Sequence, residues 1–217
     1  MKLAISMIFN VLIVGCTVYV RFWWLNIMKS DKPKEIKRKE FYRYFTTNSN
    51  VLSAFASAVV LIYEIVGLIS GSLSFSAGRI PMPQWLVLLR FAGSSSVAVT
   101  FLTVVFFLAP KAGWEMLYKD DNLYMHLLGP LMAIAAFIFE DGEMILSLGW
   151  AFLGFAIVLI YAIIYLIQVV QKGEENGGWP DFYFFNVDGK WKISFTAMLL
   201  AGALISIVLI VTRNLFI

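Results

Sequence analysis

Long, almost unbroken runs of apolar residues alternate with short polar segments along the whole chain. A helix needs roughly 20 apolar residues to cross the hydrocarbon core of a bilayer. A transmembrane β-barrel would instead show segments of ~10 residues with alternating polarity. We therefore expect an all-α polytopic membrane protein, a six-helix bundle that forms one domain over residues 1–217. The predicted spans lie at about residues 3–24, 45–69, 85–108, 122–139, 145–170 and 193–215.

The first apolar run has features of a retained helix rather than of a signal peptide. Its apolar stretch is too long, it ends in Phe22-Trp23-Trp24, and no small-residue cleavage site follows. We expect it to remain in the protein as the first span.

Composition narrows the classes of function. The chain is 60% hydrophobic and only 14% charged, whereas a soluble domain is nearer half apolar and a quarter charged. A single cysteine, Cys16, and a single histidine, His126, leave no ligands for a thiolate cluster or a multi-histidine metal site, so we expect no metal and no cofactor. A net charge of +3 is too small to indicate nucleic-acid binding. The lipid bilayer is the expected partner, and the oligomeric state stays open.

The basic residues indicate how the chain is oriented. Cytoplasmic loops of membrane proteins carry an excess of lysine and arginine. Twelve of the seventeen basic residues fall in the three odd-numbered loops, which predicts that these loops are cytoplasmic and that both termini are external. We also expect this basic surface to contact anionic lipid. The twelve residues are Lys29, Lys32, Lys34, Lys37, Arg38, Lys39, Arg43, Lys111, Lys119, Lys172, Lys190 and Lys192.

Polar residues within the spans recur at helical spacing. In hydrocarbon such side chains usually face the bundle interior, so their spacing predicts the inward face of each helix. Small and hydroxyl residues at this spacing often serve close helix packing, which we expect for residues 93–96. The stripes are Thr46, Asn50, Ser53, Ser57 and Glu64; Asn10, Thr17, Arg21 and Trp24; Gly93, Ser96, Thr100 and Thr103; and Tyr161, Tyr165 and Gln168.

Two charged residues lie inside the predicted spans at similar depth. Glu64 follows Thr46 by eighteen residues, which places it ~27 Å along the helix axis, near the external end. Arg90 lies five residues into the third span. An ion pair between Glu64 and Arg90 would satisfy both charges, and we expect a structural role for it rather than one in ion movement.

Thr46 and His126 are the candidate chemical groups. The second and fourth spans both begin on the basic side, so these two residues fall at the same end of the bundle, each within about a turn of the membrane edge. A hydroxyl and an imidazole at one depth form a candidate nucleophile–base pair. Pro130, one turn after His126, frees backbone groups near this level.

An aromatic segment at residues 179–185 belongs to the same side of the membrane. Two interpretations stay open: an interfacial aromatic belt, or a lid over the Thr46–His126 region. Asp181 within this segment, together with Asp120 and Asp121, is a candidate for orienting His126, and the sequence does not choose among the three.

These segments carry a resemblance to a known family. The run Phe41-Tyr42-Arg43-Tyr44-Phe45-Thr46-Thr47-Asn48-Ser49-Asn50, the run Asn122-Leu123-Tyr124-Met125-His126 with Pro130, and the aromatic segment between spans five and six resemble the androgen-induced-protein family of multi-pass membrane proteins. This family includes the androgen-dependent regulator of tissue factor pathway inhibitor. The triplet at 48–50 departs from the animal proteins and is similar to the bacterial branch, which implies a bacterial plasma membrane.

The resemblance implies a threonine hydrolase of lipid esters, with fatty acid esters of hydroxy fatty acids as the family's substrates. It places the nucleophile at Thr46 and the base at His126. Thr47 is the rival nucleophile, but it lies ~100° around the helix from the Thr46–Asn50 stripe. An oxyanion intermediate needs donors, and Asn50, Asn48 or Tyr44 could supply them. A non-enzymatic lipid-binding protein or a small-molecule transporter is the alternative.

Overall fold

The computed structural model describes residues 2–26, 32–75, 80–118, 121–140 and 142–217, and within these ranges the secondary structure is helical apart from an isolated bridge at Ile80. The all-α membrane-protein fold predicted from the sequence is confirmed. Within the described residues, five helices are long and apolar enough to cross a membrane. They are Lys2–Asn26 (α1), Phe45–Ile69 (α3), Gln84–Ala112, Leu148–Lys172 and Trp191–Leu215 (α8). The third consists of α4 (Gln84–Thr103), η1 (Val104–Leu108) and α5 (Ala109–Ala112). The fourth consists of η5 (Leu148–Trp150), α7 (Ala151–Leu166) and η6 (Ile167–Lys172).

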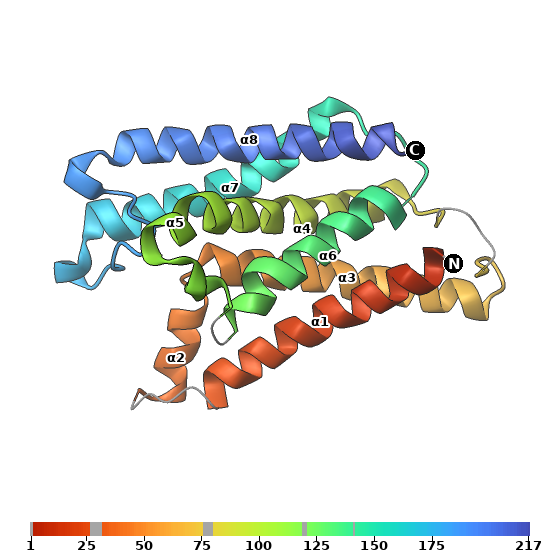
Figure 1. The fold of residues 1–217 in the computed structure, drawn as a ribbon, viewed down its shortest axis with the longest axis horizontal. Coiled ribbons are helices and arrows are strands. Elements are labelled where there is room, and N and C mark those ends of the chain that lie inside the picture. Colours follow the sequence, from red (N-terminus) through yellow and green to blue (C-terminus); the bar gives the residue numbers. More distant parts are fainter. Residues whose placement is uncertain (1, 27–31, 76–79, 119–120, 141) are drawn as a thin grey trace.

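The fourth predicted span, at about residues 122–139, forms a short helix. The apolar helix Leu123–Phe139 is shorter than the other five, so the six predicted spans correspond to five long helices and one short one within the described residues. It consists of η3 (Leu123–Leu128), α6 (Gly129–Ala135) and η4 (Ala136–Glu140), and η3 and η4 are π-helical turns. The N- and C-termini lie at the same end of the bundle (Figure 1), which requires an even number of passes along it. The short helix supplies the remaining pass.

The two ends of the bundle differ in character. We call the end that holds the termini the far end, and the opposite end, at the left of Figure 1, the basic end. The remaining short helices are all associated with the basic end: α2 (Lys34–Phe41), η2 (Trp114–Leu117), η7 (Glu174–Asn176) and η8 (Val187–Gly189). The candidate chemical groups of the sequence lie at this end.

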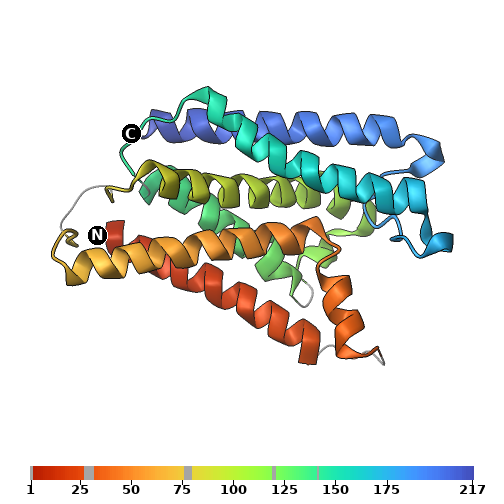
Figure 2. The same ribbon diagram turned by 180° about the vertical axis from the view of Figure 1, so that it is seen from behind.

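Helix α4 lies at the centre of the bundle, between α3 on one side and α7 and α8 on the other (Figure 2). Small residues allow this close packing: a β-carbon on Gly93 would come within 2.9 Å of the Ser53 Cα on α3. On the opposite face, the Ser95 and Ser206 hydroxyls of α4 and α8 meet at 2.8 Å. The packing role expected for residues 93–96 is therefore confirmed.

A buried arginine fastens the far end. Arg213 on α8 donates from Nη1 to the Met144 carbonyl at 2.6 Å and from Nη2 to the Gly142 carbonyl at 3.3 Å. Gly142 has φ 57°, a left-handed conformation that glycine adopts without strain. The turn between α6 and α7 is thereby tied to the end of the last helix.

Candidate functional site

Asn50 joins the two segments that carry Thr46 and His126. Its Nδ2 donates one hydrogen bond to the Thr46 carbonyl at 2.8 Å, within α3, and one to the Met125 carbonyl at 2.9 Å, in η3. Thr46 is the second residue of α3, and His126 follows Met125 directly. The structure therefore brings the start of α3 and the start of the short helix together at the basic end.

The close approach of these segments depends on Gly129. A β-carbon at this position would lie 3.1 Å from Asn50 Oδ1 and 2.9 Å from the Tyr124 carbonyl. The following residue, Pro130, lacks the N–H that would bond the His126 carbonyl in an α-helix. The chain winds as a π-turn over Leu123–Leu128, immediately before this proline. The conformation around His126 is thus set by a glycine and a proline in succession.

The His126 ring is buried, with 8% of its surface exposed. Its Nδ1 is enclosed and has no hydrogen-bond partner among the residues that the structure describes. Of its three candidate orienting groups, Asp120 lies outside the described residues. The Asp121 carbonyl accepts the Tyr124 and Met125 N–H groups, which starts the π-turn. Within the described part of the chain, no hydrogen bond joins His126 to Thr46.

The Thr46 side chain instead meets a residue that sequence reasoning missed. The hydroxyl of Tyr183, which comes from the aromatic segment, lies beside the Thr46 side chain and interacts with it. The Tyr183 oxygen also accepts the Phe45 N–H at 3.0 Å, a donor at the start of α3 that no preceding turn can satisfy. Burial raises the pKa of Tyr183, so the phenol stays neutral. The only sequence signal for this residue was its membership of an aromatic run on the same side as Thr46.

Asp181 organises the aromatic segment. Its carboxylate accepts the Phe185 and Asn186 N–H groups, both at 2.8 Å, and the Tyr165 hydroxyl at 3.1 Å. These bonds hold the segment against α7 and direct Tyr183 towards the start of α3. The Tyr183 contact at the start of α3 agrees with the interpretation of this segment as a lid. Asp181 was a candidate for orienting His126, but its hydrogen bonds come from its own loop and from Tyr165 on α7.

The amide groups suggested as oxyanion donors are already engaged. Asn48 donates both of its N–H groups to backbone carbonyls, those of Tyr42 at 3.0 Å and Tyr44 at 3.1 Å. Asn50 uses both of its own on Thr46 and Met125. The Tyr44 ring packs on Phe182 at a centroid distance of 4.5 Å, and burial, with Glu40 adding a smaller effect, raises its pKa.

Thr47 is the more buried of the two adjacent threonines. It is 4% exposed, whereas Thr46 is half-buried. The helical stripe placed Thr47 away from the interior. The structure differs because α3 is covered by α4, α1 and the short helix, so more than one narrow stripe of α3 is buried.

Glu64 and Arg90 belong to one buried network in the half of the bundle nearer the far end. The Glu64 carboxylate accepts from the Ser6 hydroxyl and from Asn10 Nδ2, the latter at 3.0 Å. Arg90 donates to Ser57 Oγ at 2.7 Å and to the Asn10 amide oxygen. Asn10 therefore connects the carboxylate to the guanidinium, and α1, α3 and α4 each contribute to the network. The direct Glu64–Arg90 ion pair stays a prediction.

Comparisons with known proteins identify no relative of this chain: no protein-family model, no curated protein and no solved structure matches it.

We predict that neutralising Glu64 alone destabilises the fold. Glu64→Gln leaves Arg90 buried without its carboxylate, and breaking a buried charged network typically costs ~3–5 kcal/mol of unfolding free energy. Thermal unfolding of purified protein in detergent measures the effect. Glu143→Gln is the matched control, because Glu143 is exposed and near the same far end. Equal melting temperatures for the two variants would show that the network contributes no stability.

We also predict a smaller loss for Tyr183→Phe. Without the phenolic oxygen, the Phe45 N–H loses its acceptor, and a hydrogen bond of this kind contributes about 1 kcal/mol. Tyr118→Phe is the control, since Tyr118 is 66% exposed near the same end. An unchanged unfolding midpoint for Tyr183→Phe would contradict the capping role.

Proposed function

We propose that this protein is an intramembrane lipid esterase in which Thr46 is the nucleophile and His126 the base. The observation that carries the proposal is the double hydrogen bond of Asn50 to the backbones of Thr46 and Met125. It joins the backbone of Thr46, which is half-buried, to the residue before His126, whose buried Nδ1 has no hydrogen-bond partner among the described residues. The resemblance to the androgen-induced-protein family supports the same two residues.

An apolar groove along the first turns of α3 supports a lipid as the substrate. The groove encloses about 350 Å³ between α3 and α7. An acyl chain lying there would stay in an apolar setting while its ester carbonyl reaches the polar start of α3. The lining residues are Phe45, Asn48, Ser49, Leu52, Ile157, Ile160, Tyr161 and Ile164.

The proposed reaction has two stages. His126 accepts the hydroxyl proton as Thr46 Oγ1 attacks the ester carbonyl, and the protonated ring then gives this proton to the departing alcohol. Water from the basic end hydrolyses the acyl-threonine, with His126 again as base, and releases the fatty acid. Because the Thr46 side chain lies beside Tyr183, its hydroxyl must turn towards His126 when substrate enters. Catalytic hydrogen bonds often form only in the complex.

Tyr183 is also the suggested source of a donor for the oxyanion. The amides of Asn48 and Asn50 already bind backbone carbonyls, whereas the Tyr183 hydroxyl lies at the nucleophile itself. Once Thr46 turns away, this neutral phenol is free to donate to the developing negative charge.

The second candidate is a lipid-binding protein without catalysis. The groove favours it independently, because binding an acyl chain needs neither the threonine hydroxyl nor the imidazole. Only the esterase needs the Thr46 hydroxyl, so replacing Thr46 with the isosteric valine distinguishes the two candidates.

We predict that Thr46→Val and His126→Gln each abolish hydrolysis of a lipid ester, and that the double variant is no worse than either single one. Residues that act as a unit are non-additive in this way. The measurement is turnover of a fatty-acid ester by purified variants in liposomes, with folding checked by thermal unfolding. Thr47→Val is the matched control and retains activity. Full turnover by folded Thr46→Val would remove threonine catalysis and leave the lipid-binding function.

We also propose a location in the plasma membrane of a bacterium, with the basic end in the cytoplasm and both termini outside. The concentration of lysine and arginine at the basic end supports this orientation.

Cysteine labelling in intact cells tests the orientation. In a Cys16→Ala background, a membrane-impermeant maleimide is expected to label Ser72→Cys directly and Lys39→Cys only after permeabilisation. Both positions are exposed, and Lys39 lies at the basic end. The reverse pattern would show that the basic end faces outward.

A further inference from the structure

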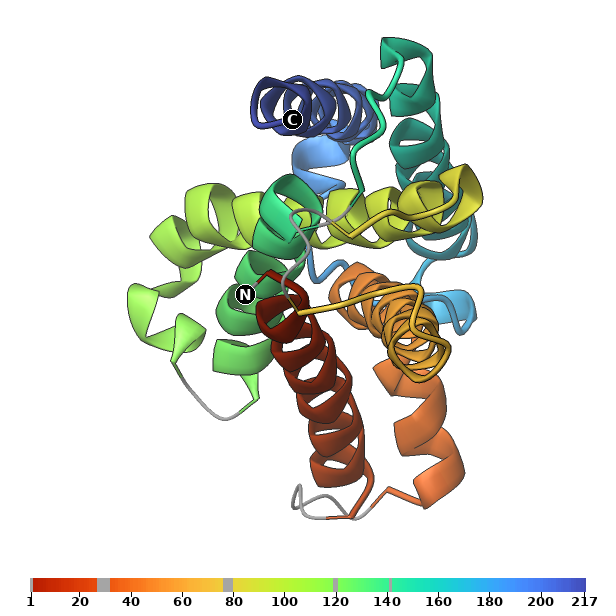
Figure 3. The same cartoon turned by 90° about the vertical axis from the view of Figure 1, so that its right-hand side faces the viewer.

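Helix α2 lies crosswise at the basic end. It runs roughly perpendicular to the long axis of the bundle in Figures 1 and 2. Figure 3, which looks along the bundle, shows α1 and α2 extending to one side of the other helices. Since the long helices cross the membrane, a helix perpendicular to them at their end lies parallel to the membrane surface, at the depth of lipid headgroups.

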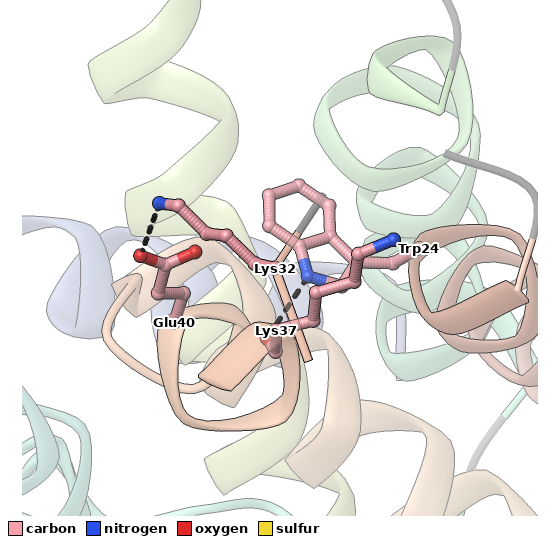
Figure 4. A network of polar contacts seen from close by, with 4 residues as sticks. All are labelled: Trp24, Lys32, Lys37 and Glu40. Atoms are coloured by element: carbon pink, nitrogen blue, oxygen red, sulfur yellow. Dashed lines mark hydrogen bonds and ion pairs between the residues drawn. The ribbon is translucent and has the colours of Figure 1, made fainter. Parts of the chain in front are cut away.

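This helix is fixed to the bundle rather than loosely attached. The Trp24 indole N–H, near the end of α1, donates to the Lys37 carbonyl at 3.0 Å (Figure 4). The same indole packs on the Phe41 ring at a centroid distance of 5.6 Å. Lys37 is only 7% exposed, so this face of α2 is the bundle-facing one. The remaining faces of α2 therefore have a defined orientation.

The outward faces are strongly basic. Residues 32–43 contain six basic and two acidic side chains. One of the two acids, Glu40, is paired with Lys32 at 2.7 Å (Figure 4). Lys34, Arg38 and Lys39 are exposed, and the first two share a helix face at i, i+4 spacing. Ile36 is 45% exposed, which gives this charged helix an apolar side chain to place among lipid tails.

We propose that α2 is a binding surface for anionic phospholipid headgroups of the surrounding leaflet, with Lys34, Arg38 and Lys39 as its phosphate-binding side chains. Each basic residue held near an anionic membrane surface adds to its attraction, and a helix in the plane of the interface presents several at once. Trp24 and Phe41 hold the helix at that level, so the charges meet headgroups without further ordering of the backbone. The surface requires no assumption about which reaction the protein catalyses.

A second basic group at the same end supplies an internal comparison. Lys172, Lys190 and Lys192 are also exposed, but they lie among acidic residues, and Lys190 pairs with Asp188 at 3.6 Å. Their local charge is largely balanced. Neutralising these three lysines changes the net charge of the protein as much as neutralising three basic residues of α2.

The experiment is a titration of the full-length purified protein with phosphatidylglycerol or phosphatidylcholine, followed by native mass spectrometry. The triple variant Lys34→Gln/Arg38→Gln/Lys39→Gln is expected to bind phosphatidylglycerol at least ~tenfold more weakly than wild type, from the contribution of each surface charge. The control Lys172→Gln/Lys190→Gln/Lys192→Gln is expected to change binding less than ~twofold. Phosphatidylcholine binding should be the same in all three proteins.

Three results would overturn the proposal. The two triple variants could lose phosphatidylglycerol equally, which would assign the effect to net charge. Wild type could bind both lipids equally well, which would remove headgroup selectivity. Inorganic phosphate could displace the lipid from wild type, which would make α2 a general anion site. All substituted side chains are exposed, so folding should be preserved, and single Arg38→Gln and Lys39→Gln variants serve if a triple variant unfolds.

Discussion

Hydrocarbon offers no hydrogen-bond partners, so polar side chains between the helices must find partners inside the protein. The bundle meets this demand with side chains that bind two elements at once. Asn10 connects a carboxylate on α3 to a guanidinium on α4, and Asn50 connects two backbone carbonyls on different helices. These asparagines fix where α1, α3, α4 and the short helix stand relative to one another. Apolar side chains pack around these two asparagines and fill the remaining space between the helices.

The basic end follows the same constraint with different groups. The N–H groups at the start of α3 have no partners within the helix, and a phenol from a distant loop reaches one of them. That loop is itself ordered by one carboxylate, that of Asp181. The environment of Thr46 is therefore assembled from α3, the aromatic segment and α7, each held by a polar bond to the next.

Periodicity predicted much of this arrangement. The polar residues of the first two stripes are mostly buried, as their spacing indicated, because a polar side chain in a span is unfavourable when it faces hydrocarbon. The buried ones are Asn10, Thr17, Asn50, Ser53, Ser57 and Glu64. The pattern failed at Arg21, which is exposed near the end of α1, where a long side chain can reach the membrane surface. It could not find Tyr183 either. That contact depends on how a loop folds back over 138 residues of sequence, and no local spacing encodes such a path. The sequence also could not show that the Asn48 and Asn50 amides donate to backbone carbonyls. An amide N–H that can donate to an oxyanion can donate to a carbonyl oxygen equally well.

The π-turn before Pro130 has a consequence for how this region can change. A π-turn is an α-helix with one residue too many, so the side chains that precede it are displaced by about 100° relative to an uninterrupted helix. Loss of a single residue within Leu123–Leu128 would restore regular α-helical winding and turn His126 towards a different neighbour. The position of α6, which begins at Gly129, would not change. The direction of the only imidazole in the chain is thus set by the length of one turn. Insertions and deletions here, more than substitutions, are the changes that would redirect it.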